Sequence, residues 1–241
     1  MKRATFKCLF ALLSSLFVDS RALALTYDAV NDFSYTNNPN GAWSYGWEHQ
    51  LGDSFNLDAT NSGTGWIGID GFNDSNIWKN LDSVYHNGVA PGEISMQTGR
   101  DTDRFAVVRW TSPIDGVFSI DGYFGAGDTG INGWGYMSYF VYHNNSPEYS
   151  LHQTYGDGYF NLSDTVHQGD TIDFIIGEAW AWGNTPLHAD ITLTGSLPVS
   201  GNPIPAPSTM SLIFSALVGF FVFSSQADRN KLGRNLPRNT A

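Results

Sequence analysis

The chain has 241 residues and a formal net charge of −11, with aromatic residues at 15% and charged residues at only 15%. Low charge together with 26 glycines is typical of short strands joined by tight turns, and it argues against helical bundles and disordered chains. Residues 25–204 hold 4 of the 12 Lys and Arg but 21 of the 23 Asp and Glu, so this part of the chain has a net charge of −17. Such a charge argues against binding to nucleic acid or to anionic membranes.

A single cysteine limits the redox and metal chemistry of the chain. Cys8 is the only cysteine, and it lies in a leader segment. Disulfides, thiolate nucleophiles and Cys-ligated zinc are therefore excluded from the body that follows. The acidic surface attracts cations, so a structural calcium ion is the one cofactor that the sequence keeps open. The plainer interpretation of this acidity is solubility outside the cell.

Residues 1–24 predict a secretory signal peptide. Three basic residues precede an apolar run at 8–18, and Ala22-Leu23-Ala24 follows it as a small-x-small cleavage site. The apolar run is too short to span a membrane, which argues against the alternative of a retained anchor. We expect residues 25–197 to be exported as one domain.

The first half of this body predicts short strands separated by polar turns. Residues 25–35 suit an edge strand, and the sequence Asn-Asn-Pro-Asn-Gly at 37–41 is a dense turn signal. Trp43, Tyr45 and Trp47 then alternate with small residues, so a strand would project all three rings from one face. Shorter strands are expected at 66–69, 77–85 and 94–97.

Residues 104–124 carry the strongest strand signal. Two runs rich in β-branched and aromatic residues flank a Ser-Pro-Ile-Asp-Gly turn at 112–116. Each run has an apolar face made of alternate residues, namely Ala106, Val108 and Trp110 in the first and Phe118 and Ile120 in the second. We predict that the two runs form the central hairpin of a β-sandwich.

The second half of the body continues the same pattern, with strands expected at 136–143, 149–154, 159–166, 169–177 and 187–197. About ten to twelve short strands without helical periodicity predict an all-β fold, a two-sheet antiparallel β-sandwich. The opening at 38–46 and the Gly-Asp-x-Ile-Asp-Phe turn at 169–174 resemble the jelly-roll sandwiches of carbohydrate-binding type that occur in exported bacterial proteins. The resemblance implies a non-catalytic module that recognises sugars.

Two glycine-rich segments supply the expected sugar contacts. A sugar ring stacks its C–H face on an exposed aromatic ring, while carboxylates and amides bind its hydroxyls. We therefore predict a ligand-binding site made of exposed rings and neighbouring polar side chains: Trp134, Tyr136, Trp180, Trp182, Glu178, Asp128 and Asn184. The alternative is that such rings fill the core, and this alternative is favoured for Trp43 and Tyr45.

Oxygen ligands suited to calcium occur at two places in the sequence. Asp70 and Asp74 form one group, and Asp101 and Asp103 form the other. Carboxylates are the ligands that calcium prefers. Because the spacing matches no calcium-binding loop, turn formation by aspartate is the competing interpretation.

The end of the chain predicts a membrane-directed segment. Residues 198–207 form a Pro/Gly linker, residues 208–225 suit a transmembrane helix in the inner membrane, and residues 226–241 form a basic cytoplasmic tail. The layout, with Pro205-Ala206-Pro207 at its start, resembles the PEP-CTERM sorting signal of exported bacterial proteins, although Ala206 replaces the glutamate of that family. The resemblance implies processing by an exosortase-type enzyme and an exopolysaccharide-producing Gram-negative envelope. A plain membrane anchor is the alternative.

Catalysis has little support in the sequence. The chain lacks a zinc-protease His pair, a Gly-x-Ser-x-Gly elbow and a thiol in the body. A glycosidase pair stays open, because such a pair is defined by the separation of two carboxylates in space. We expect a non-catalytic, envelope-anchored protein that binds glycan or an exopolysaccharide matrix. The alternatives are a structural or adhesive envelope protein without a small-ligand site, and a glycoside-active enzyme on the same fold.

Overall fold

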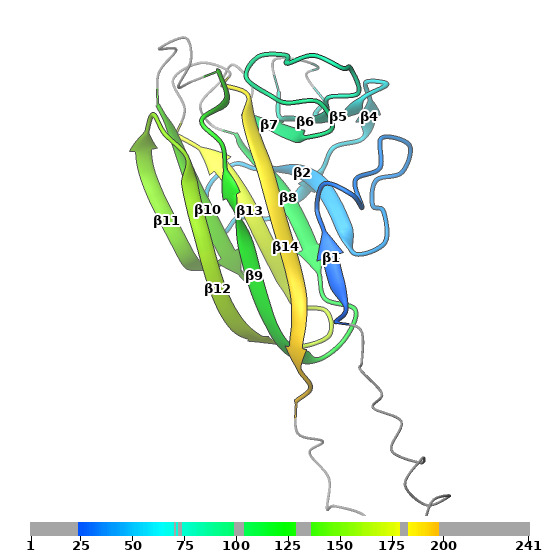
Figure 1. Cartoon of the computed structure of the whole chain (residues 1–241), viewed down its shortest axis with the longest axis vertical. Helices are drawn as coiled ribbons and strands as arrows, with labels where there is room; N and C mark the ends of the chain where they lie inside the picture. Colours follow the sequence, from blue (N-terminus) through cyan, green and yellow to red (C-terminus); the bar gives the residue numbers. More distant parts are fainter. Residues whose placement is uncertain are drawn as a thin grey trace, which may run out of the picture. The chain divides into compact units, whose positions relative to one another are not determined.

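A computed structural model describes residues 24–69, 71, 74–98, 104–128, 136–178 and 183–197. The expected signal peptide, linker, transmembrane helix and basic tail lie outside these residues, apart from Ala24. Within the described ranges no helix has the length and apolar character needed to cross a membrane. The described residues form two antiparallel sheets packed face to face (Figure 1).

The larger sheet has eight strands in the described part of the chain. Its order is β12-β9-β14-β7-β6-β5-β4, and β1 pairs with β14. The strands are β1 (Thr26–Asp28), β4 (Thr60–Asn61), β5 (Gly65–Ile67), β6 (Asn76–Lys79), β7 (Ile94–Gln97), β9 (Gly116–Phe124), β12 (Gly158–Val166) and β14 (Thr185–Gly195).

The smaller sheet has six strands in the same ranges, in the order β11-β10-β13-β8-β2-β3. The strands are β2 (Trp43–Glu48), β3 (Asn56–Leu57), β8 (Phe105–Thr111), β10 (Met137–His143), β11 (Ser146–Thr154) and β13 (Thr171–Gly177). The predicted two-sheet antiparallel sandwich is thus confirmed. The described residues contain more strands than the sequence predicted, partly because β3 and β4 are two-residue strands within a polar stretch that carries no strand pattern.

The predicted central hairpin at 104–124 is wrong. β8 and β9 follow one another in sequence, but β8 pairs with β2 and β13 in the smaller sheet, whereas β9 pairs with β12 and β14 in the larger one. The turn at 112–115 therefore carries the chain from one sheet to the other. Trp110 and Phe118 face each other across the core, with ring centroids 5.2 Å apart. The predicted inward faces are confirmed even though the pairing is not, because alternation determines the face of a strand and not its partner.

Aromatic side chains fill the space between the two sheets. Trp43, Tyr45 and Trp110 from the smaller sheet are at most 1% exposed, and so is Phe118 from the larger sheet. The interpretation of Trp43 and Tyr45 as core residues is confirmed. Burying each ring of this size stabilises the fold by about 1.5–3 kcal/mol, so this aromatic layer contributes much of the hydrophobic stabilisation.

The outer face of the smaller sheet carries a second, small core that contains an ionic network. Phe55 covers Arg109 at 4.3 Å from its ring centroid. The Arg109 guanidinium donates to Asp173 at 2.6 and 2.8 Å and to Glu48 at 3.3 Å. Both carboxylates are at most 1% exposed. Burial and the neighbouring Asp173 raise the pKa of Glu48 to about 7, because one guanidinium serves two buried acids.

Candidate functional site

The residues predicted to bind sugar fall into separate groups. Trp134, Trp180 and Trp182 lie outside the described residues. Tyr136 precedes β10 and meets Tyr155 edge to face, with ring centroids 6.4 Å apart. It is partly buried, and its neighbour Tyr155 is 60% exposed.

Asp128 and Asn184 bind one another. The backbone N–H of Asn184 donates to Asp128 Oδ1 at 2.6 Å, and Asn184 Nδ2 donates to Oδ2 at 3.0 Å. Asn184 Oδ1 accepts a hydrogen bond from Trp78 Nε1 at 3.2 Å. These three side chains therefore connect β6 with the segment that follows β9 and the segment that precedes β14.

Glu178 belongs to a different group, at the end of β13. It accepts hydrogen bonds from Ser138 Oγ at 2.7 Å and from His152 Nδ1 at 3.0 Å. The Ser138 hydroxyl lowers the pKa of Glu178 despite its partial burial, and His152 adds to the effect. The described contacts place Glu178 with Ser138 and His152, and place Asp128 with Asn184.

The calcium candidates are also divided. Asp70, Asp101 and Asp103 lie outside the described residues. Asp74 is fully buried and forms an ion pair with Arg104. Ser75 donates its hydroxyl to Asp58 Oδ1 at 2.9 Å, and burial raises the pKa of Asp58 to about 7. A calcium ion in this region stays a prediction.

An aromatic row crosses the outer face of the larger sheet. Tyr123 on β9 lies directly opposite Tyr159 on β12 and opposite His188 on β14. The Tyr123 and His188 rings are stacked at 5.7 Å with an interplanar angle of 8°, and the Tyr159 ring lies 5.7 Å from Tyr123. Tyr159 is 70% exposed. We call these three residues the aromatic row.

Sequence analysis missed the aromatic row, although a signal for each member was present. In every one of the three strands the row residue alternates with core residues, so each ring could be predicted to face outward. Their alignment depends on how β12, β9 and β14 pair. Pairing between strands far apart in sequence is not visible in the alternation of any single strand.

Polar side chains lie on the same outer face, next to the aromatic row and toward the start of β9. Asp121 lies opposite both Asn161 and Asp190, and Ser119 lies opposite Ser163 and Thr192. Partial burial, together with the nearby Asp28 and Asp121, raises the pKa of Asp190. The outer face therefore changes from rings to carboxylates to hydroxyls along the strands.

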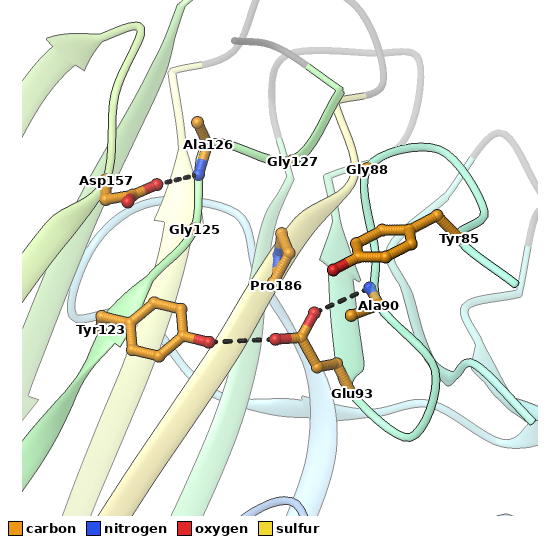
Figure 2. Close-up of a pocket in the computed structure, with 10 residues that line it drawn as sticks. All are labelled: Tyr85, Gly88, Ala90, Glu93, Tyr123, Gly125, Ala126, Gly127, Asp157 and Pro186. Atoms are coloured by element: carbon orange, nitrogen blue, oxygen red, sulfur yellow. Dashed lines mark hydrogen bonds between the residues drawn. The ribbon is translucent and has the colours of Figure 1, made fainter. Parts of the chain in front are cut away.

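A hollow of about 320 Å³ adjoins the aromatic row (Figure 2). Its lining includes Tyr85, Glu93, Tyr123, Asp157 and Pro186. Figure 2 shows Tyr85 and Tyr123 on either side of Glu93. Tyr85 is 71% exposed, so a largely accessible ring lines the hollow.

Each of the two carboxylates in the hollow holds one tyrosine of the aromatic row and one backbone group. Glu93 accepts the Tyr123 hydroxyl at 3.0 Å and the Ala90 N–H at 2.8 Å. Asp157 accepts the Tyr159 hydroxyl at 3.1 Å and the Ala126 N–H at 2.8 Å. A carboxylate has about four acceptor positions, so each group can still accept hydrogen bonds from a ligand.

Glycines allow the walls of the hollow to meet. A Cβ on Gly88 would lie 2.3 Å from the backbone carbon of Gly127, and a Cβ on Gly127 would lie 1.6 Å from the Asn184 carbonyl oxygen. Both glycines also have positive φ, of 82° and 55°. The loop after β6, the segment after β9 and the residue before β14 therefore touch through their backbones, which a side chain would prevent.

Comparison with known proteins gives only distant likenesses. Neither a protein-family model nor a curated protein matches the chain. Among solved structures it is similar to a family 35 carbohydrate-binding module from Clostridium thermocellum, with 12% identity, a TM-score of 0.31, and coverage of 48% of this chain and 90% of that chain. It is similar to GITRL from bushbaby, with 18% identity, a TM-score of 0.29, and coverage of 39% and 74%.

A further similar structure is an exo-β-1,3-galactanase from Phanerochaete chrysosporium with β-1,3-galactotriose. The identity is 14%, the TM-score is 0.30, and the match covers 61% of this chain and 32% of that chain. These proteins are of different kinds, and no assignment of function rests on likenesses of this degree.

Proposed function

We infer that the β-sandwich body is a non-catalytic glycan-binding module, and that it binds glycan at the aromatic row and the adjoining hollow. The observation that carries this proposal is the placement of an exposed ring, Tyr159, beside a hollow that contains two carboxylates, Glu93 and Asp157. The bound polymer would be a polysaccharide of the surrounding matrix.

The chemistry of the hollow suits a sugar. A pyranose ring offers an apolar face of C–H groups, which packs on an aromatic ring, and a rim of hydroxyls, which need acceptors. Tyr159 and Tyr85 would supply the rings, and the unfilled acceptor positions of Glu93 and Asp157 would take the hydroxyls. A hollow of about 320 Å³ is small for a ligand pocket, so most of a longer chain would lie on the open face.

The charge of the body restricts the glycan class. Residues 25–204 have a net charge of −17, and the outer face carries Asp121 and Asp190 in addition to the two carboxylates of the hollow. Anionic polymers such as polyuronates would be repelled by this surface. We therefore expect a neutral or amino-substituted polysaccharide.

Export and anchoring belong to the same proposal and rest on the two ends of the sequence. Residues 1–24 would direct secretion and be removed, and residues 208–225 would hold the protein in the inner membrane. An exosortase-type enzyme acting near Pro205-Ala206-Pro207 would release the module into the envelope or the extracellular matrix. Mass spectrometry of the protein recovered from the producing cell would identify both ends directly.

A glycan array tests the binding proposal. We expect the full chain to bind neutral polysaccharides, and Tyr159→Ala to weaken binding about tenfold or more, as for an aromatic residue worth about 1.4 kcal/mol. Tyr35→Ala is the matched control, because Tyr35 is an exposed tyrosine outside the aromatic row. Tyr35→Ala should bind as the wild type does.

Other outcomes of the array would contradict the proposal. Binding that survives Tyr159→Ala but is lost in Trp134→Ala or Trp180→Ala would move the site to the loops predicted from sequence. Complete absence of glycan binding would favour a structural or adhesive role. Release of reducing ends from any bound polysaccharide would favour an enzyme.

A further inference from the structure

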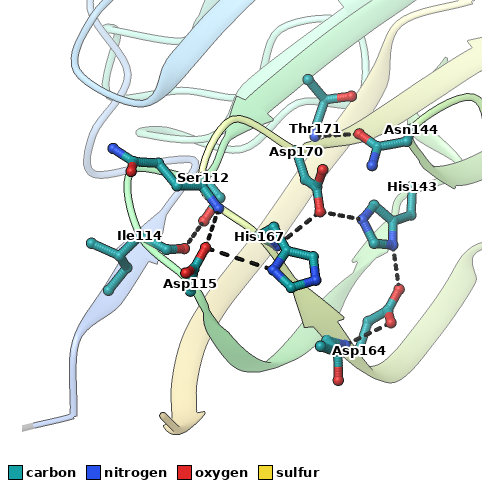
Figure 3. Close-up of polar contacts among 11 residues, drawn as sticks. Ser112, Ile114, Asp115, His143, Asn144, Asp164, His167, Asp170 and Thr171 are labelled. Atoms are coloured by element: carbon teal, nitrogen blue, oxygen red, sulfur yellow. Dashed lines mark hydrogen bonds and ion pairs between the residues drawn. The ribbon is translucent and has the colours of Figure 1, made fainter. Parts of the chain in front are cut away.

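A histidine and two carboxylates gather at the end of the sandwich opposite the hollow, and Figure 3 labels two of them, His143 and Asp164. Asp164 lies opposite Phe118, near the start of β9, whereas Tyr123, near the end of β9, lines the hollow. The group consists of His143, Glu148 and Asp164. One ligand atom from each residue lies within 4.8 Å of the others.

The fold brings these three side chains together from different strands. His143 ends β10 of the smaller sheet, in the alternate series that contains the core residues Tyr139 and Val141. Asp164 lies on β12 of the larger sheet, in the series that contains Phe160 and Leu162. Both side chains therefore point between the sheets where the apolar core ends, and His143 Nδ1 lies 2.6 Å from Asp164 Oδ2.

A β-bulge places the third side chain. Tyr142 pairs with Pro147 and Val141 pairs with Tyr149, so Glu148 is an extra residue in β11. Bulges redirect the side chains next to them and often occur beside functional sites. Glu148 is exposed, so its carboxylate is reachable from solvent and can adjust its position.

A fourth residue orients the imidazole. The Nε2 atom of His143 lies 3.3 Å from Asp170 Oδ2, which also accepts the His167 N–H at 2.8 Å. A carboxylate that holds one ring nitrogen of a histidine, leaving the other for an ion, is the usual arrangement around metal-bound histidines.

We propose that His143 Nδ1, Glu148 and Asp164 form a binding site for a divalent transition-metal ion of the zinc class. An imidazole nitrogen with two carboxylates suits zinc and similar ions, whereas calcium and magnesium prefer oxygen ligands alone. Three protein ligands leave a fourth tetrahedral position for water. With metal–ligand distances of about 2.0–2.2 Å, ligand atoms lie roughly 3.4 Å apart. On binding, the exposed Glu148 would therefore close in, and His143 Nδ1 and Asp164 Oδ2, which lie 2.6 Å apart without the ion, would separate. Any proton on Nδ1 would leave to solvent.

Calorimetric titration of the chelator-stripped full chain with zinc chloride tests the site, with calcium chloride in parallel. We expect one zinc ion to bind through these residues and to raise Tm, because an ion that binds only the folded state stabilises it. We expect calcium at the same concentrations not to displace the zinc, and any calcium binding elsewhere to be unchanged in Glu148→Gln. Failure of wild-type protein to bind zinc, or displacement of the zinc by an equal concentration of calcium, would overturn the proposal.

Variants distinguish zinc binding at this site from zinc binding at other histidines. Glu148→Gln is the decisive change, because Glu148 is exposed, whereas loss of His143 also removes its contacts with Asp164 and Asp170. We expect Glu148→Gln and His143→Gln to lower zinc affinity at least tenfold, and Asp170→Asn to lower it about 10- to 100-fold. His167→Gln, at an exposed neighbouring histidine, is the control and should bind zinc normally. Equal affinity in the wild type, Glu148→Gln and His143→Gln would exclude the site.

Discussion

The phenolic oxygen of Tyr123 lies 3.0 Å from Oε1 of Glu93, and this hydrogen bond joins the middle of the aromatic row to the residue that precedes β7. Burial and the Glu93 carboxylate raise the pKa of Tyr123 to about 12. A neutral phenol is thus favoured by the folded state, because ionisation would place two negative charges side by side.

Tyr123→Phe should therefore change stability in a pH-dependent way. Near pH 7 the variant should lose about 0.5–1.5 kcal/mol of free energy of unfolding, the usual net value of one hydrogen bond. The raised pKa of Tyr123 stabilises the folded state. This stabilisation is fully present below about pH 10, where tyrosine in the unfolded chain begins to ionise, and it is lost as the pH rises to about 12.

Urea unfolding at pH 7, 9, 10 and 11 measures the effect. The difference between wild type and Tyr123→Phe should shrink above pH 10. A difference that stays constant with pH would mean that the Tyr123 hydroxyl does not titrate as its contact with Glu93 requires.

Glu48→Gln should make the free energy of unfolding depend less on pH between about pH 4.5 and 7. The pKa of Glu48 is raised to about 7, so its contribution to stability is fully present below the ordinary pKa of 4.5 and is lost as the pH rises through 7. We expect the wild type to lose stability relative to Glu48→Gln across this window. Denaturant midpoints in matched buffers from pH 4 to 8 measure the change.

Asp58→Asn offers an independent check that a buried carboxyl group with a raised pKa makes stability fall as the pH rises. Burial raises the pKa of Asp58 to about 7, and its bonding partner is Ser75 rather than Arg109. The effects of Asp58→Asn and Glu48→Gln on the pH dependence should therefore add in the double variant. Stability that rises steadily from pH 4.5 to 8 in wild type would contradict both assignments.

Arg109→Met should be severely destabilising at pH 8. The substitution leaves Glu48 and Asp173, two buried carboxylates, without their shared cation, and removing one partner of a buried ion pair typically costs about 3–5 kcal/mol. The triple variant Arg109→Met, Glu48→Gln, Asp173→Asn should recover much of this loss, since no buried charge remains in the network. Free energies of unfolding for the single and triple variants at pH 8 measure both the loss and its recovery.

Gly88→Ala and Gly92→Ala form a matched pair. Both glycines have nearly equal φ, 82° and 83°, so a Cβ at either position should cost about 1–2 kcal/mol of backbone strain. A Cβ on Gly92 meets nothing within 4 Å, whereas one on Gly88 would overlap the backbone of Gly127. Gly88→Ala should therefore lose about 1–3 kcal/mol more than Gly92→Ala. Thermal unfolding of both variants measures the difference, and equal losses would contradict the close backbone contact.

Alternation within single strands was enough to predict the fold class and most of the core. It placed Val108, Trp110 and Ile120 in the interior, where all three are buried. It could not predict that β8 and β9 separate into different sheets, because a short turn can join two strands of one sheet or of two facing sheets equally well. The sequence pattern around 112–116 is the same in either case.

The candidate site was harder to predict for a related reason. The site predicted from sequence consisted mainly of tryptophans in glycine-rich loops, whereas the aromatic row consists of single rings on three regular strands. Glu93 and Tyr123 are separated by 30 residues and meet only because β7 and β9 both pair with β14. Likewise, His143 and Glu148 are close in sequence, but Asp164 joins them from the other sheet.

The passage of the chain between layers at 112–115 also governs how the molecule can be assembled. Strands from before and after this turn contribute to both layers, so no continuous stretch of polypeptide contains a whole layer. Truncated halves should consequently fail to fold alone, and the intact body should fold slowly, in milliseconds to seconds, since distant segments must meet before either layer is complete.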